Sequence, residues 1–451
     1  MARKIRLACV ATLVTISVGC VAILAQAQFD QAVRDFERQD YDGALARLEK
    51  TIRDGGDSAR IRTLLGWTLY KQGELARARV ELERALRVDA QDPNAFYAHE
   101  GLGWIAYKLG EHDRAAGAFA ESLRLAPGYA NAQTGLGWVR LAKRDLVRAA
   151  ASFQAALAGK PDDLDARRGL ALVAYHRGDW ARAAVLLQEV LRANPGDAVS
   201  RSTLGWVHYY KGEYDRARPI FEELVRGEPT WADPLLGLAW IADRQGRPVD
   251  ARAGIRAAIA KSARYTAGTE VRQLLAARPA WLEVWRELGW GLYHERAFAQ
   301  AEAEFRALLA RHPEDPDALR GLGYSLHALK RYGDALTPLR RSLASGAVLP
   351  PIQEKVEIQG ATGLHSITSD AASTLAWAVY HLGDHQAALA QFRDVTRSHQ
   401  DWVDPWSGLG WTLLKLGRAG EAEQAFRHSL AIRPGYPDAM AGLRALGRAD
   451  R

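Results

Sequence analysis

The chain has 451 residues, of which 48% are hydrophobic and 25% charged, a balance typical of a folded protein rather than a disordered one. Its 60 Lys and Arg against 53 Asp and Glu give a formal net charge of +7, far from the concentrated basic charge of a duplex-binding domain. Only two cysteines occur, Cys9 and Cys20, so a disulfide framework and an all-cysteine metal site are excluded.

The N-terminal segment has the pattern of an export signal. Three basic residues, at positions 3, 4 and 6, precede an uncharged stretch over residues 7–25, and Ala25-Gln26-Ala27 fits a cleavage site. Residues 1–27 are therefore predicted to be a signal peptide cut after Ala27 or an uncleaved membrane anchor, because the stretch is long enough to cross a bilayer. A lipoprotein site at Cys20 is a weaker alternative. All three place the rest of the chain in the periplasm.

Residues 28–434 repeat one sequence pattern with a dominant period of 34 residues. The pattern opens with Leu, a small residue and usually Trp, as in Leu102-Gly103-Trp104 and Leu136-Gly137-Trp138. An Ala follows twelve residues after the small residue, a bulky apolar side chain comes four later, and Pro closes many units. Two apolar runs at helical spacing are usually separated by Gly, which ends a helix at low cost because it accepts a left-handed conformation. Each unit is therefore predicted to be a helix–turn–helix.

This pattern resembles that of the tetratricopeptide repeat family, whose units read W-x2-L-G-x2-Y, then A-x3-F, then P. Eleven such units fit between residues 28 and 434, the first of them imperfectly. The resemblance implies an all-α fold, a right-handed superhelical solenoid in which stacked helix pairs share a continuous core. Residues 435–451 are predicted to cap the stack.

Two insertions interrupt the period, near residues 261–277 and 346–364. The second contains an alternating run at residues 355–359, which predicts a short hairpin strand and is the one β signal in the sequence. Each insertion is either a tolerated surface loop or a contact that closes over a groove of the solenoid.

One departure from the family pattern suggests where a ligand binds. In eight units Trp directly follows the small residue, at a position that in similar repeats lies on the first helix and faces the concave groove. Three residues later, one turn along the same face, Tyr is frequent, and the next position often carries a cation. The predicted ligand-binding groove consists of Trp67, Tyr70, Lys71, Trp104, Tyr107, Lys108, Trp138, Tyr175, Trp206, Tyr209, Trp240, Trp290, Tyr293, Trp377, Tyr380 and Trp411.

The same aromatic stripe has a purely structural interpretation. Aromatic side chains at helical spacing usually belong to a core, and these Trp could pack between successive first helices. Glycines that precede the Leu, such as Gly135 and Gly169, would make room for that packing. Packing and ligand contact stay open as alternatives, and the two are compatible. Five other aromatics, eight residues before the small position, are interpreted as contacts between repeats: Tyr129, Trp231, Trp281, Trp402 and Tyr436.

Little in the sequence indicates catalysis. It contains no HExxH, no P-loop and no G-x-S-x-G, and its twelve histidines are dispersed without metal-ligand spacing. The acidic residues near the starts of first helices are interpreted as favourable N-terminal charges and caps rather than as catalytic pairs: Asp233, Glu283, Asp317, Asp370 and Asp404. The chain is therefore predicted to be no enzyme and to use no cofactor or metal.

Two functions from different classes fit these observations. The first is a periplasmic scaffold that binds an extended segment of a protein partner in its aromatic groove and assembles a cell-envelope complex. The alternative is a polysaccharide-binding module of an exopolysaccharide or cellulose export system, because Trp and Tyr rings can stack on sugars. Fold alone does not choose between them. No nucleic-acid partner is expected, and membrane contact is expected only through an uncleaved N-terminal segment.

Overall fold

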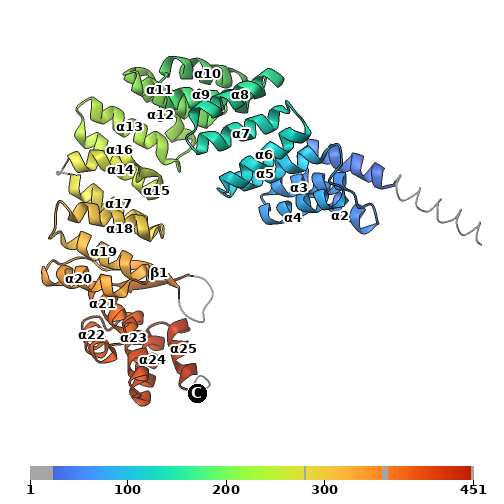
Figure 1. The fold of residues 1–451 in the computed structure, drawn as a ribbon. Helices are drawn as coiled ribbons and strands as arrows, with labels where there is room; N and C mark the ends of the chain where they lie inside the picture. Colours follow the sequence, from blue (N-terminus) through green and yellow to red (C-terminus); the bar gives the residue numbers. More distant parts are fainter. Residues whose placement is uncertain (1–23, 279–280, 358–363, 448–451) are drawn as a thin grey trace, which may run out of the picture. The chain divides into compact units, whose positions relative to one another are not determined.

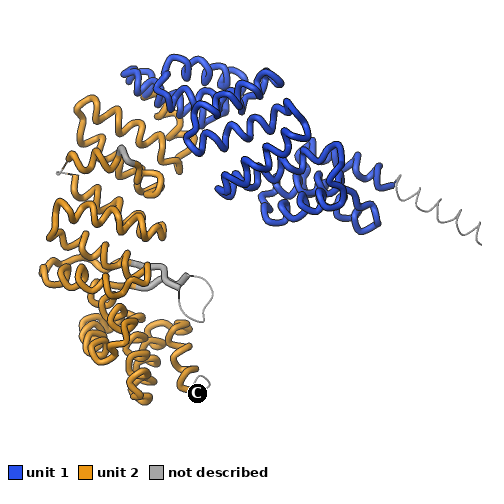
Figure 2. The backbone as a smooth tube through the Cα atoms, viewed as in Figure 1, with its two compact units in different colours: residues 1–217 blue, residues 218–451 orange. Residues whose placement is uncertain are grey.

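The computed structural model describes residues 24–278, 281–357 and 364–447, and α-helices dominate them (Figure 1). The chain forms two compact units, residues 1–217 and 218–451 (Figure 2). Within each unit, helices that follow one another in the sequence pack together as pairs, and each pair packs on the next. Eleven helix pairs are described, so the predicted all-α solenoid of eleven repeats is confirmed.

The first unit holds a helix over residues 24–37, whose partner is α2 (Tyr41–Arg53), and four complete repeats after it. These repeats are α3 (Ala59–Gln72) with α4 (Leu75–Val88), α5 (Ala95–Lys108) with α6 (His112–Leu125), α7 (Ala130–Ala142) with α8 (Leu146–Gly159), and α9 (Leu164–His176) with α10 (Trp180–Ala193). Then come α11 (Ala198–Tyr210) and α12 (Tyr214–Gly227), which contains the boundary between the units.

The second unit continues the same alternation. Its helix pairs are α13 (Ala232–Arg244) with α14 (Pro248–Lys261), α17 (Leu282–His294) with α18 (Phe298–Leu309), α19 (Pro316–Ala328) with α20 (Tyr332–Ala344), α21 (Ala371–His381) with α22 (His385–Ser398), and α23 (Val403–Lys415) with α24 (Ala419–Ile432). A last helix, α25 (Pro437–Ala445), packs against α24 and α23.

Both insertions contain secondary structure. The first holds two short helices, α15 (Ala263–Thr266) and α16 (Thr269–Ala277). The second holds an antiparallel hairpin of β1 (Ile352–Glu357) and β2 (Leu364–Ser369), in which Ile352 lies opposite Ser369 and Glu357 opposite Leu364. The strand predicted at residues 355–359 therefore overlaps β1, and its last two residues lie outside the described part of the chain.

In several repeats a phenylalanine ring packed against glycines joins one helix pair to the next, and in others a leucine does so, as Leu82 does against Gly66 and Gly101. The fully buried Phe153 ring lies between its own first helix and the first helix of the following repeat. A Cβ built on Gly137 would stand 2.6 Å from Phe153 Cε1, and one on Gly169 would stand 2.3 Å from Phe153 Cζ. The glycines that precede Leu were predicted to make room for Trp. A Cβ on Gly101 would stand 3.3 Å from Trp67 Cε2, as predicted, and 2.7 Å from Leu82 Cδ1, whereas Gly135 and Gly169 make room for the preceding repeat's Phe.

The turn inside every pair requires one residue with positive φ. Seven pairs use glycine there, as at Gly73 with φ of 84°. The other four place an L-residue in the left-handed region, with φ between 58° and 64°: Gln39, Arg144, Arg296 and Lys330. Because this conformation costs an L-residue roughly 1–2 kcal/mol, those turns are held by the packing of the two helices rather than by local preference.

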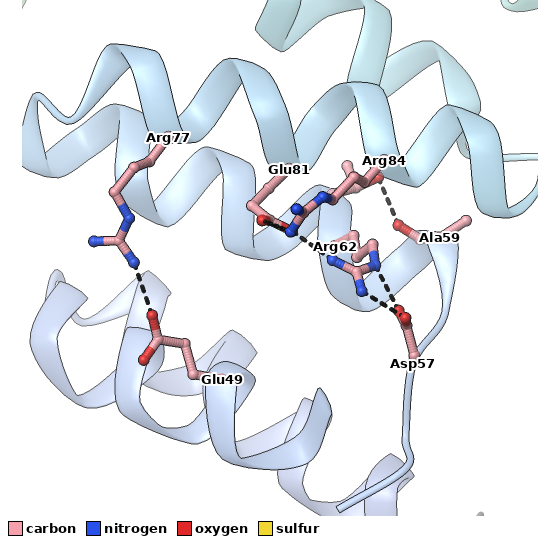
Figure 3. A network of polar contacts seen from close by, with 8 residues as sticks. Glu49, Asp57, Ala59, Arg62, Arg77, Glu81 and Arg84 are labelled. Atoms are coloured by element: carbon pink, nitrogen blue, oxygen red, sulfur yellow. Dashed lines mark hydrogen bonds and ion pairs between the residues drawn. The ribbon is translucent and has the colours of Figure 1, made fainter. Parts of the chain in front are cut away.

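A polar network fixes the start of α3, the helix that carries Trp67 (Figure 3). Arg62 Nη2 lies 2.5 Å from Asp57 Oδ2, and Arg62 Nη1 lies 2.6 Å from Glu81 Oε2 on α4. The Arg62 side chain is largely buried, and these two carboxylates raise the pKa of its guanidinium. The pairs thus hold the two helices of this repeat together at one end and position the first helix for the site described next.

Candidate functional site

A groove of about 880 Å³ runs across the first helices of the N-terminal repeats. Its walls come from the helix over residues 24–37, from α3, α5 and α7, and from the segment that leads into α9. Seven aromatic side chains line it: Phe29, Phe36, Trp67, Tyr70, Tyr97, Trp104 and Tyr129. Helical spacing explains the arrangement, because successive turns of each first helix present the same face to the groove.

Four of the predicted groove residues lie together here, namely Trp67, Tyr70, Lys71 and Trp104. The other predicted residues occupy the corresponding faces of first helices elsewhere in the two units, and do not line this groove. For them, ligand contact stays a prediction. They are Tyr107, Lys108, Trp138, Tyr175, Trp206, Tyr209, Trp240, Trp290, Tyr293, Trp377, Tyr380 and Trp411.

The repeated Trp are half-buried, so packing and exposure coexist at this position. The Trp138 ring meets Phe153 edge-on at 5.5 Å between centroids, with the Arg168 guanidinium 5.4 Å from its centre. Trp67 Nε1 donates to the backbone carbonyl of Tyr97 in the next repeat at 3.1 Å. These Trp side chains therefore pack or hydrogen-bond with neighbouring helices while part of each ring remains accessible to solvent.

Buried acids connect these Trp along the stack. Asp404 is only 6% exposed and accepts hydrogen bonds from Trp377 Nε1 at 2.6 Å and from Tyr436 Oη at 3.1 Å. Because burial disfavours its charged form, the pKa of Asp404 rises to about 6. Asp317 accepts in the same way from Trp290 at 3.1 Å.

The five acids lie at helix N-termini, as predicted: Asp233, Glu283, Asp317 and Asp404 stand in the first turns of α13, α17, α19 and α23. Asp370 caps α21, with Ser373 completing a reciprocal capping box. Asp233, like Asp317 and Asp404, also accepts a side-chain hydrogen bond across the stack, from Tyr265 Oη. Glu283 pairs with Arg252 of the preceding repeat at 3.0 Å. Sequence alone did not reveal these bonds, because each donor lies about 30 residues from its acceptor.

Two carboxylates on the groove wall are satisfied within the protein. Glu100 is 4% exposed and accepts from Tyr129 Oη at 2.7 Å and Trp104 Nε1 at 3.4 Å. Its burial raises the pKa of the Glu100 carboxyl, and burial together with the neighbouring Glu100 carboxylate raises the pKa of the Tyr129 phenol. Asp163 caps α9 through the amides of Asp165 and Ala166 and accepts from Thr134 Oγ1 at 2.8 Å.

The exposed charges at the groove are mainly cationic. Arg60, Lys71 and Lys160 are exposed lining residues, and the Arg60 guanidinium lies 4.7 Å from the centre of the Phe29 ring. Lys108 Nζ lies 4.3 Å from the centre of the Tyr70 ring. The exposed acids are Glu37 and Asp165, and Asp165 Oδ1 pairs with Arg168 Nη2 at 2.7 Å.

Several of these groove residues carried no signal in the sequence. Phe29 and Phe36 belong to the imperfect first repeat, where the motif is weakest. Tyr97 has no aromatic counterpart in most repeats, so no periodicity marked it, although its side chain is 40% exposed at the groove. Spatial proximity across four repeats is what makes these rings one surface.

Other kinds of site find little support in the described part of the chain. Within it, no three His, Cys, Asp or Glu side chains gather in a way that could hold a metal ion. None of the helices described there combines the length and apolar character needed to span a membrane. The predicted signal or anchor of residues 1–27 lies mostly outside the described residues.

A family model for the tetratricopeptide repeat matches residues 29–93, 64–130, 134–198, 202–265, 286–350 and 373–437. Together these matches span well over half of the chain. The chain belongs to the tetratricopeptide repeat family. Proteins of this family are generally non-catalytic, protein-interacting scaffolds, which is the broad class that the sequence predicts.

Comparisons with individual proteins add the fold alone. No curated protein sequence matches the chain. Among solved structures, a tetratricopeptide repeat protein from Parabacteroides merdae is 17% identical with a TM-score of 0.41, covering 53% of this chain and 93% of its own. PilF of Pseudomonas aeruginosa is 17% identical with a TM-score of 0.41, and the match covers 47% of this chain and 94% of PilF. PilW, a type IV pilus biogenesis factor, is 22% identical with a TM-score of 0.41, and the match covers 48% of this chain and 98% of PilW.

Proposed function

We propose that this protein is a non-enzymatic scaffold that binds an extended segment of a protein partner in the groove of its N-terminal repeats. The observation that carries the proposal is the groove itself, where seven aromatic side chains from successive first helices form one lined surface of about 880 Å³. Aromatic side chains are common binding anchors, because they bury a large area at low cost in conformational entropy.

Charge indicates which segments fit best. The carboxylates of Glu100 and Asp163 are buried and hydrogen-bonded, and the exposed Asp165 pairs with Arg168. A ligand therefore meets three exposed cations, Arg60, Lys71 and Lys160, against one exposed acid, Glu37, that forms no ion pair within the described part of the chain. An extended segment that alternates apolar side chains with Asp or Glu would place rings or aliphatic groups against the aromatic wall and carboxylates beside the cations. Such complementarity contributes to orientation and association rate more than to affinity.

The location and wider role of the scaffold follow from the N-terminal sequence. The basic flank, apolar stretch and cleavage motif of residues 1–27 support export, and we propose that the repeats act in the periplasm as part of a cell-envelope complex. Alkaline phosphatase fused to the C-terminus would then be active in intact bacteria. A stably expressed but inactive fusion would contradict export without affecting the proposed groove.

Fluorescence anisotropy tests the binding proposal directly. The purified full-length chain is titrated against a labelled acidic peptide in which Glu alternates with Leu and Tyr, a matched peptide with Lys in place of Glu, and labelled cello-oligosaccharides. We expect the acidic peptide to bind at least tenfold more tightly than its Lys counterpart, with the difference shrinking as salt screens the charges. Preferential binding of the oligosaccharide would favour the polysaccharide alternative instead.

Charge reversal at the groove provides the matched control. Lys71→Glu together with Lys160→Glu should weaken the acidic peptide by about tenfold, because each exposed ion pair contributes up to about 1 kcal/mol and reversal adds repulsion. Lys50→Glu together with Lys261→Glu reverses two equally exposed charges outside the groove lining, on α2 and α14, and should leave the affinity unchanged. Equal losses in both proteins would mean that only net charge is sensed.

A further inference from the structure

Two histidines lie in the contact between the ninth and tenth repeats. His381 of α21 stacks on Tyr332 of α20 at 4.5 Å between centroids, and on Trp377 at 5.9 Å on its other side. His327 of α19 approaches the same cluster, with its ring centre 5.3 Å from that of Tyr332 and 6.0 Å from that of His381. The first helices of two repeats thus meet through imidazole rings that can take up a proton.

His327 is an exception to the repeat pattern. It stands four residues after the small Gly323, and six other repeats carry tyrosine at that position: Tyr70, Tyr107, Tyr175, Tyr209, Tyr293 and Tyr380. The Nε2 atom of His327 is buried and has no hydrogen-bond partner among the described residues. A phenol at this place would stay neutral throughout the physiological range, whereas an imidazole titrates within it.

We propose that His327 makes the joint between the ninth and tenth repeats sensitive to acid, so that its protonation loosens the contact between α19 and α21. A proton on Nε2 would place a charge where the fold provides no acceptor, and an unpaired buried charge is costly. The titratable and charged groups that face the cluster are Tyr332 from α20, His381 from α21 and Lys330 from the intervening turn. None of them supplies a negative charge near neutral pH.

The pH window follows from the direction of the shift. Burial, and to a lesser extent His381, lowers the pKa of His327 from 6.5 to about 4 in the folded chain. His327 therefore binds a proton more readily when the joint is open or unfolded. The stability that neutral His327 contributes to the closed joint is complete above about pH 6.5 and is lost as the pH falls toward 4. Burial and Lys330 lower the pKa of His381 as well, which adds to the effect in the same direction.

Hydrogen exchange on the full-length chain tests this proposal, with rates expressed as protection factors so that the intrinsic pH dependence cancels. Between pH 7 and pH 5 we expect protection in α19, α20 and α21 to fall on the order of tenfold, while α5 to α8 serve as an internal reference. In His327→Tyr, which restores the residue of the other repeats, the fall should be absent or much smaller. Titration of Asp404, which lies farther along the stack, is common to both proteins and cancels in their difference.

The possible outcomes separate clearly. An equal change of protection in the wild type and in His327→Tyr would overturn the proposal, because the contribution of Asp404 is common to both proteins. If the larger tyrosine already lowers protection at pH 7, the comparison is repeated with His327→Gln, a neutral residue of similar length. A His327→Gln protein that keeps the acid-induced fall would overturn the proposal as well.

Discussion

Replacing Gly169 with alanine is expected to destabilise the fold, although alanine normally favours a helix. Gly169 lies inside α9, and an added Cβ would stand 2.3, 2.4 and 2.6 Å from three ring carbons of Phe153. The ring cannot retreat, because Phe153 is 0% exposed and Gly137 closes its other side. Overpacking costs about 1–3 kcal/mol, and three contacts below 3 Å place this site in the upper part of that range, at about 2–3 kcal/mol. The helix preference of alanine returns about 1 kcal/mol, so a net loss of about 1–2 kcal/mol is expected.

The matched control is the same substitution where space is open. Gly117 lies inside α6, and a Cβ there would meet nothing within 4 Å, so Gly117→Ala should raise stability by about 1 kcal/mol. Urea denaturation followed by circular dichroism gives both midpoints. Because each repeat contacts only its neighbours, hydrogen exchange should place the loss in Gly169→Ala within α7 to α10. A Gly169→Ala protein as stable as the wild type would refute the ring-between-glycines packing.

Three further predictions follow from individual contacts. Trp377→Phe should lower the free energy of unfolding by about 1–3 kcal/mol in thermal or urea denaturation, because it leaves a buried oxygen of Asp404 without its indole donor. Trp138→Phe should cost less, because the indole of Trp138 makes no hydrogen bond in the described structure. Because the pKa of Asp404 is raised in the folded chain, its neutral carboxyl stabilises the fold fully below about pH 4, and up to ~3 kcal/mol of this free energy of unfolding is lost as the pH rises through about 6. Comparing the denaturation midpoints of the wild type and of Asp404→Asn at each pH isolates this contribution. A difference between the two proteins that does not depend on pH would contradict it. Gln39→Gly should raise the midpoint by an amount equivalent to about 1 kcal/mol, because Gln39 has φ of 64°, and a loss of stability would show that the turn is not strained.

The fold was largely predictable because its signal is periodic. A pattern such as Leu136-Gly137-Trp138, repeated every 34 residues in most units, fixes helix pairs, turn positions and the number of repeats. What periodicity misses are contacts between positions that do not recur. The glycine before Leu was assigned to Trp, which lies against it at Gly101 but not at Gly169, since a sequence shows that space is needed but not that Phe153 fills it.

The candidate site was predictable only in part. The Trp and Tyr positions on the first helices were identified from their spacing, and Trp67, Tyr70 and Trp104 do line the groove. Tyr97 was not identified, because its role depends on the stacking that brings side chains of four repeats around one space. The acceptors of the indole groups were missed for the same reason, since Asp404 and Trp377 are neighbours only after the helices stack.

Photo-crosslinking provides the most direct test of the central claim that the N-terminal groove receives an extended acidic segment. A benzophenone is placed at the middle of the labelled Glu–Leu–Tyr peptide, crosslinked to the full-length chain, and the attachment sites are identified by mass spectrometry. The account predicts attachment at the groove, on Trp67, Tyr97 or Trp104, and loss of attachment when unlabelled peptide competes. Attachment mainly to exposed side chains of second helices, such as Val147 or Val185, or to residues 218–451, would contradict it.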